Sequence, residues 1–125
     1  MKWPPKGMEE MVGKWEGNCL RECPKYAYTY SLALKRIWRF WPRKTHPRLL
    51  RITDIEDYKA WRRERGTSWG TVKWELAALR HFITFLRRDL QMEIELTVIY
   101  PTRESWNEQH TKLDGRRNNG RRAED

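Results

Sequence analysis

The stretch from Ser68 to Leu86, SWGTVKWELAALRHFITFL, decides the fold that we expect for this chain. Its apolar residues recur at the three- and four-residue spacing of one helix face, and they are Val72, Leu76, Leu79, Ile83 and Leu86. Ser68 is a suitable N-cap, so the pattern predicts a long helix that runs to about Arg88. An apolar face of this length must be buried against other elements, so a packed helical domain is expected.

One flank of this predicted helix carries a line of positive charge. Lys73, Arg80 and Arg87 recur every seven residues, which is almost two helical turns, so they are expected along one edge at intervals of about 10 Å. Only the small residues Ala77 and Thr84 lie between them. Cations spaced along a rigid rod can each neutralise a phosphate of a nucleic acid. The flank is therefore predicted to contact DNA phosphates, and the alternative is an ordinary solvated helix flank.

The net charge of +9 is concentrated in the middle of the chain. Residues 25–89 hold sixteen Lys or Arg and six Asp or Glu, a net charge of +10, whereas residues 1–24 balance to zero and residues 90–125 to −1. The positive excess therefore belongs to the part whose periodicity predicts folding. With 38% hydrophobic residues, that part can also supply a core.

Two shorter helices are predicted before the long one. Apolar residues mark one face from Tyr26 to Trp41, where Pro42 ends the helix, and Lys35 and Arg39 share its opposite side. The inward residues of this helix include Trp38 and Trp41. After a basic loop, residues 53–56 have the Thr-x-x-Glu form of a capping box, which predicts a helix that buries Ile55, Tyr58 and Trp61 and stops at Gly66.

The two ends of the chain show less pattern. Residues 1–24 are expected to be an irregular lead-in segment, so the folded domain should begin near Pro24. Beyond Leu90, apolar and polar residues alternate from 92 to 98 as in a short strand, but no partner strand is apparent, so residues 91–111 are expected to form an extended or helical arm. Residues 112–125 are polar and should be disordered. The predicted fold class is all-α, with three to five helices.

Neither a metal centre nor a membrane segment is expected. Cys19 and Cys23 lack the second pair of ligands that zinc sites normally show, because His46, His81 and His110 stand apart in the sequence. We therefore expect Cys19 and Cys23 to be reduced thiols that bind no cofactor. No run of about 20 apolar residues and no signal-peptide pattern occurs, so we expect a cytoplasmic protein without a membrane partner.

The order of these motifs resembles a known family. Ile52-Thr53-Asp54-Ile55 opens a helix, Gly66 breaks it, and Ser68-x-x-Thr71-Val72 precedes Leu76-x-x-Leu79-Arg80-x-Phe82. Residues 25–89 thereby resemble the SAM-like core-binding domain of the tyrosine recombinases, or phage integrases. In that family the domain is a small helical bundle that forms half of a clamp around duplex DNA. The resemblance implies double-stranded DNA as the partner, with a separate catalytic domain or further protomers as possible additional partners.

The catalytic constellation of that family does not occur in this sequence. No His is followed by Arg three residues later, and no Tyr lies beyond Tyr100. A phosphotyrosyl intermediate needs several preorganised cations around the attacked phosphate. The chain is therefore expected to be no enzyme by itself, and to serve as a DNA-binding module for recombination and integration. The alternative is a helical protein-interaction module that docks a catalytic subunit or another protein, using Trp74 and the segment with Glu93 and Glu95.

Individual roles follow from these expectations. The candidate DNA contacts are Lys35, Arg39, Thr71, Lys73, Trp74, Arg80, His81, Thr84 and Arg87. Thr71 has a second interpretation as part of the helix start. Trp74 lies away from the apolar face, so either another segment covers it or it contacts a partner. His81 could donate a hydrogen bond to DNA, although a single helical His is more often simply exposed.

Overall fold

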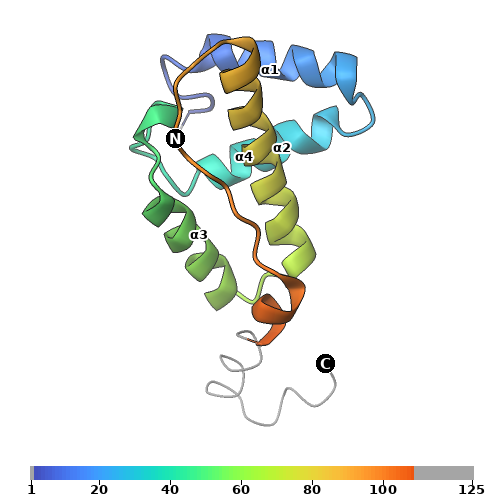
Figure 1. Ribbon diagram of the computed structural model, residues 1–125, viewed down its shortest axis with the longest axis vertical. Coiled ribbons are helices and arrows are strands. Elements are labelled where there is room, and N and C mark those ends of the chain that lie inside the picture. The colour runs from blue at the N-terminus through green and yellow to red at the C-terminus, as the bar shows by residue number, and fades with distance from the viewer. Residues whose placement is uncertain (1, 109–125) are drawn as a thin grey trace.

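The long helix α4 (Trp69–Asp89) is the axis of the computed structural model, which describes residues 2–108 (Figure 1). The Ser68 side chain accepts a hydrogen bond from the Thr71 backbone N–H at 3.3 Å, which confirms the predicted N-cap. All five predicted apolar-face residues of α4 are buried, with Val72, Leu76, Leu79 and Leu86 fully enclosed and Ile83 1% exposed. The described residues form helices and no strand, so the all-α prediction is confirmed.

Helix α2 (Ala27–Trp38) makes the most extensive packing against α4. Leu34, Ile37 and Trp38 supply its buried face. The helix ends three residues earlier than predicted, because the Pro42 ring would clash with the carbonyl four residues before it, which belongs to Trp38. That carbonyl instead accepts the Trp41 N–H at 2.9 Å in a tighter turn.

A loop containing the short 3₁₀ helix η1 (Pro47–Leu49) leads into α3 (Ile52–Glu64). The capping box lies two residues earlier than predicted, because the Asp54 carboxylate, rather than that of Glu56, accepts the N–H of the N-cap residue Arg51 at 2.7 Å. At the other end Gly66 adopts a φ of +76°, a conformation that favours glycine, as the predicted helix stop requires. Ile55 and Tyr58 are buried as predicted, while Trp61 is only half-buried.

The first 24 residues are not an irregular lead-in, and this prediction is wrong. Residues Glu9–Glu22 form the helix α1, which crosses the end of α4 at the top of Figure 1. Its residues Met11, Val12, Trp15 and Cys19 are buried, and Trp15 has no exposed surface. The signal was weak because glycines at 13 and 17 and charged residues interrupt the apolar pattern of this helix. The core therefore begins at Met8 and not near Pro24.

Residues 91–101 form an extended arm that runs back along α4, in the opposite direction (Figure 1). The predicted alternation is present in its burial, since Ile94, Leu96 and Val98 are each 6% exposed and the residues between them are exposed. The arm belongs to no β-ladder among the described residues and packs on helices instead. Residues 103–108 then form a last helical turn, where the fully buried Trp106 donates its indole N–H to the Thr67 carbonyl at 2.8 Å.

One core extends from Met8 to Trp106, so the predicted boundaries at residues 24 and 90 do not separate packing units. The predicted disordered tail, residues 112–125, lies outside the described residues. In the described part of the chain, no helix has the combination of length and apolar character that a bilayer crossing needs.

Candidate nucleic-acid interface

The predicted phosphate-binding flank of α4 lies along the seam between this helix and the arm. Lys73 places its ammonium 4.8 Å from the centre of the Trp69 ring, and the Arg80 guanidinium lies 5.3 Å from the centre of the Tyr100 ring. These are cation–π contacts, and both basic residues remain exposed. The flank is therefore partly used for internal contacts and is not the free row of cations that the sequence predicts.

Arg87 is the member of the flank that is most fully engaged. Its Nε donates to the Ile94 carbonyl at 2.6 Å, and one of its terminal N–H groups donates to the Leu96 carbonyl. Because the arm makes no strand pairing among the described residues, these carbonyls need another donor, and a guanidinium can satisfy two of them at once. Arg87 thus holds the arm, and its role as a DNA contact stays a prediction.

Replacing Arg87 with Gln is therefore expected to loosen the arm. The variant loses two charge-assisted hydrogen bonds at a partly exposed site, so the free energy of unfolding should fall by about 1–2 kcal/mol. The measurement is amide hydrogen exchange of residues 91–100, which should become faster while exchange in the centre of α4 stays slow. Arg88→Gln is the matched control, since among residues 2–108 this neighbouring guanidinium forms ion pairs with Asp89 and Glu22 and has no hydrogen bond to the arm. Equal protection of the arm in both variants would contradict this role of Arg87.

Three further candidates on α4 have individual surroundings. Thr71 is exposed and its hydroxyl accepts a hydrogen bond from the Ser68 hydroxyl at 3.0 Å, so it takes part in the helix start. Thr84 is exposed on the flank. Trp74 is covered by another segment, because its ring stacks on Tyr30 at 5.0 Å and meets the edge of Tyr26 at 5.7 Å. Trp74 was expected either to be covered by another segment or to contact a partner, and in the structure two tyrosines cover it.

His81 is half-buried, with its ring packed against α1 and α2, and is not the simply exposed residue that a single helical His usually is. Its Nδ1 accepts the Trp15 indole N–H at 2.9 Å, and its ring packs against Tyr30 at 5.0 Å. Burial, and then the nearby charge of Arg88, lower the pKa of His81. The neutral ring is also the form that can accept the Trp15 hydrogen bond. His81 therefore joins α1 to α4, at the end of the molecule where the two cysteines lie.

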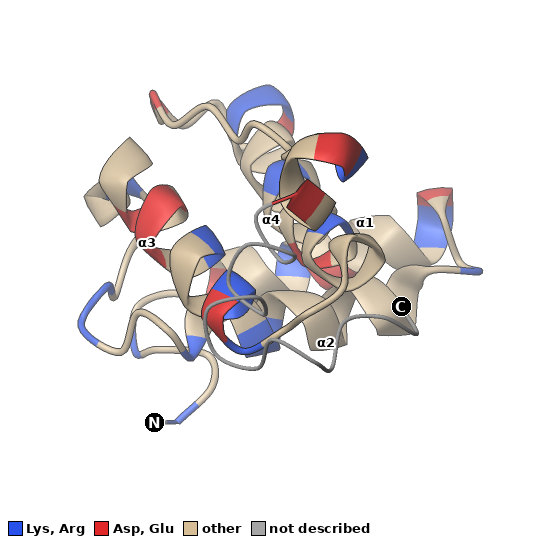
Figure 2. Ribbon diagram, turned by 90° about the horizontal axis from the view of Figure 1, so that it is seen from below, with Lys and Arg blue, Asp and Glu red and all other residues tan. Residues whose placement is uncertain are grey.

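The basic residues of α2 and the following loop are less engaged than the flank. Lys35 and Arg39 are exposed, as predicted, and they have no carboxylate within ion-pair distance among the described residues. Four arginines that are not among the predicted DNA contacts are also exposed and have no carboxylate within ion-pair distance among the described residues. They are Arg36, Arg43, Arg48 and Arg51. We refer to Lys35, Arg36, Arg39, Arg43, Arg48 and Arg51 as the basic surface. Figure 2 shows the Lys and Arg positions of the loop between α2 and α3 at the edge of the molecule beside the N-terminus.

A sequence signal for the basic surface exists, but it is not a periodic one. Residues 23–53 contain eight Lys or Arg and no Asp or Glu. Helical periodicity indicates the regularly spaced cations of α4. It does not indicate a basic run that continues from a helix into a loop. Lys44 is the exception within this run, because it forms an ion pair of 3.4 Å with Asp54.

The basic surface has distinct borders. Arg36 lies at a groove of about 280 Å³ between α2 and the start of α4, where Thr71 and Trp74 also line the wall. On the other side, Arg48 and Arg51 share a second groove with the arm residues Glu93 and Glu95. These glutamates place negative charge beside Arg48 and Arg51.

A buried polar network positions α3 against α4 behind these surfaces. Glu75 is 2% exposed and accepts hydrogen bonds from the Tyr58 hydroxyl and from the Arg62 guanidinium, whose Nε lies 3.0 Å from Glu75 Oε1. Burial, together with the Glu75 carboxylate, raises the pKa of Tyr58, so its hydroxyl stays a donor. Glu75 is therefore directed at α3 and does not neutralise Lys73 or Arg80.

The described residues thus offer a basic surface that consists of exposed, mostly unpaired cations, next to an α4 flank whose cations are partly engaged. Comparison of this chain with protein-family models, with curated proteins and with solved structures found no match.

Proposed function

We propose that this chain is a non-catalytic module that binds duplex DNA, with the basic surface as its main phosphate contact. The observation that carries the proposal is the run of residues 23–53, which holds eight cations and no acid; among the described residues seven of these cations have no carboxylate partner, and six of the seven form the basic surface. Exposed cations that lack carboxylate partners gain the most from phosphate contact, because each releases counterions from the nucleic acid. Duplex DNA is chosen because residues 25–89 resemble the core-binding domain of tyrosine recombinases, which also suggests a recombination context.

The exposed cations Lys73 and Arg80 supply a second, weaker set of contacts in this proposal. Their heads lie over aromatic rings and retain exposed surface, so a phosphate can approach them without displacing an internal carboxylate. Arg87 is left out of the main contacts of this proposal because two of its donors already hold the arm.

The experiment is a titration of labelled duplex DNA with the full chain at several salt concentrations. We expect the logarithm of the binding constant to fall linearly with the logarithm of salt concentration. Replacing Lys35, Arg39 and Arg43 together with Gln should weaken binding at least about 10-fold and reduce the salt slope by roughly 2.7, since each lost phosphate contact accounts for about 0.9. Lys73→Gln with Arg80→Gln should have a smaller effect.

A matched control removes the same charge elsewhere. Lys14 and Arg21 lie on α1 and Arg88 in the last turn of α4, where Lys14 and Arg88 pair with acids, and replacing these three with Gln should change the affinity much less. Similar losses in both triple variants would mean that only net charge matters. A binding constant that does not depend on salt would reject phosphate-driven binding altogether.

A second candidate function is docking onto another protein, and one observation favours it. Leu20, Tyr26 and Tyr28 are 65%, 45% and 78% exposed around the turn that joins α1 to α2. The expected anchor Trp74 is covered by tyrosines, so these three residues would take its place. Sedimentation of the protein with and without DNA separates the two functions. Self-association or binding of another protein would support docking if the substitutions Leu20→Ser and Tyr28→Ser abolish it.

A further inference from the structure

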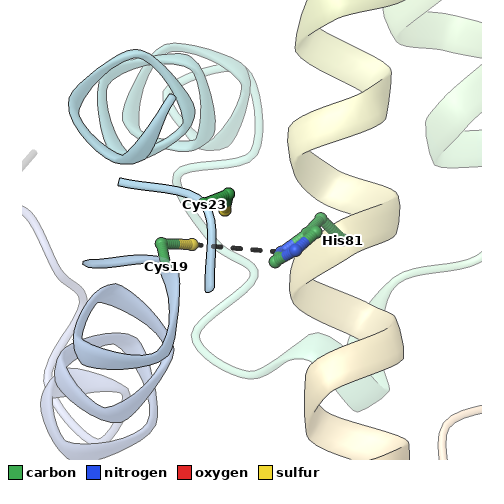
Figure 3. Close-up of side chains that lie close together, drawn as sticks. All are labelled: Cys19, Cys23 and His81. Carbon is green, nitrogen blue, oxygen red and sulfur yellow. Dashed lines mark hydrogen bonds between the residues drawn. The ribbon is translucent and has the colours of Figure 1, made fainter. Parts of the chain in front are cut away.

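Two cysteines and one histidine that are far apart in the sequence meet at the junction of α1 and α4. Cys19 lies in the last turn of α1, Cys23 caps that helix, and His81 points at them from the middle of α4 (Figure 3). One ligand atom from each residue lies within 4.8 Å of the other two. Cys19 Sγ and His81 Nδ1 are 4.0 Å apart. No other group of three His, Cys, Asp or Glu with this spacing occurs among residues 2–108.

The local backbone explains why the two thiols face the same way. Residues four apart lie on one face of a helix, so Cys23 sits above Cys19, and the Cys23 N–H donates to the Cys19 carbonyl at 2.8 Å. The third residue is placed by core packing, because Trp15 meets the edge of Phe82 at 5.3 Å and thereby sets α1 against the face of α4 that carries His81.

The donor set is characteristic of zinc. Thiolate and imidazole are the preferred ligands of Zn²⁺, with bonds of about 2.3 Å to sulfur and 2.0–2.1 Å to nitrogen. For tetrahedral angles these bond lengths require ligand atoms roughly 3.6–3.8 Å apart. The observed 4.0 Å between sulfur and nitrogen, and the limit of 4.8 Å for all three atoms, differ from this by at most about an ångström. Side-chain rotation of Cys23, which is only half-buried, can supply such a shift.

We propose that Cys19, Cys23 and His81 bind one thiophilic cation of the zinc class, with water in the fourth position, and that the ion joins α1 to α4. Cys23 and His81 are both partly exposed, which gives the ion and the water access. Coordination through Nδ1 replaces the hydrogen bond from the Trp15 indole. The bound ion also links Cys19 to His81, which are 62 positions apart in the sequence. This site is independent of the proposed DNA contacts.

The test uses the full chain, stripped with a chelator and kept reduced with a phosphine, and titrates it with Co²⁺ and then with Zn²⁺. We expect one Co²⁺ per chain, with the thiolate-to-metal charge-transfer band and the intense visible bands of tetrahedral Co²⁺, and Zn²⁺ should displace it. A Zn²⁺ excess of about 100 times the dissociation constant should raise Tm by roughly 5–10 °C. It should also slow the alkylation of both thiols.

Three variants decide the assignment. Cys23→Ser should abolish the charge-transfer band and the Tm shift, and His81→Gln should weaken Co²⁺ binding at least about 10-fold. His46→Gln is the matched control, because this residue lies in the loop before η1, and it should bind as the parent does. Unfolding curves without metal establish that each variant is folded. A parent chain without the charge-transfer band, or a band of equal strength in His81→Gln, would overturn the site.

Discussion

Replacing Trp15 with Ala is expected to lower the free energy of unfolding by about 3–5 kcal/mol, the range for removing a large aromatic side chain from a packed core. Trp15 has no exposed surface, meets the edge of Phe82 at 5.3 Å, and donates its indole N–H to His81. Its loss leaves a cavity between α1 and α4 and an unpaired acceptor. Because whole domains are stable by only about 5–15 kcal/mol, urea unfolding should show a large shift of the midpoint.

The control for this prediction is Tyr28→Ala, which removes another aromatic ring from a neighbouring helix. Tyr28 is 78% exposed, so its loss should change the free energy of unfolding by no more than about 0.5 kcal/mol. If the two variants had equal stability, α1 would contribute nothing to the core and the N-terminal segment would be the separate lead-in that the sequence suggested.

Replacing Glu75 with Ala is the second change with a large expected effect. The substitution leaves the fully buried Tyr58 hydroxyl and the Arg62 guanidinium without their acceptor. Breaking a buried ion pair from one side typically costs about 3–5 kcal/mol, and we expect about 3 kcal/mol here because the Arg62 side chain is still 19% exposed. Chemical denaturation of the variant measures this loss.

Two further substitutions separate the causes of that loss. Glu75→Gln keeps an oxygen acceptor without the charge, so its stability should lie between those of the parent and Glu75→Ala. Glu56→Ala removes an exposed carboxylate from a pair of 2.8 Å with Lys59, and it should cost less than about 1 kcal/mol. An effect of Glu75→Ala as small as that of Glu56→Ala would mean that the buried network does not hold α3 against α4.

Much of the fold could be predicted because its signals are local. Ser68 caps α4, Gly66 stops α3 and Pro42 ends α2, and each acts through backbone chemistry within a few residues. The apolar face of α4 was predicted in full, since a 21-residue helix gives a strong periodic signal. Helix α1 was missed, because its glycines and charges obscure a pattern that only packing against α4 reveals.

The candidate site was less predictable, because it depends on which segments return to cover α4. The seven-residue spacing of Lys73, Arg80 and Arg87 is a fact of the sequence, but their availability depends on the arm. The sequence also separates Cys19 from His81 by 62 positions, and no periodicity predicts that they meet. The basic surface, by contrast, was present in the sequence as a run without acids.

The sequence by itself determined that this chain is helical, that Ser68 starts α4 and Gly66 stops α3, and that the positive charge lies in the middle, since hydrophobic period, caps and formal charge are properties of neighbouring residues. Only the tertiary structure decided that Arg87 binds the arm, that His81 faces two thiols, and that Glu75 is buried against α3. The physical reason is that a side chain's partners are set by the packing of distant segments, and the burial of one shared core brings those segments together.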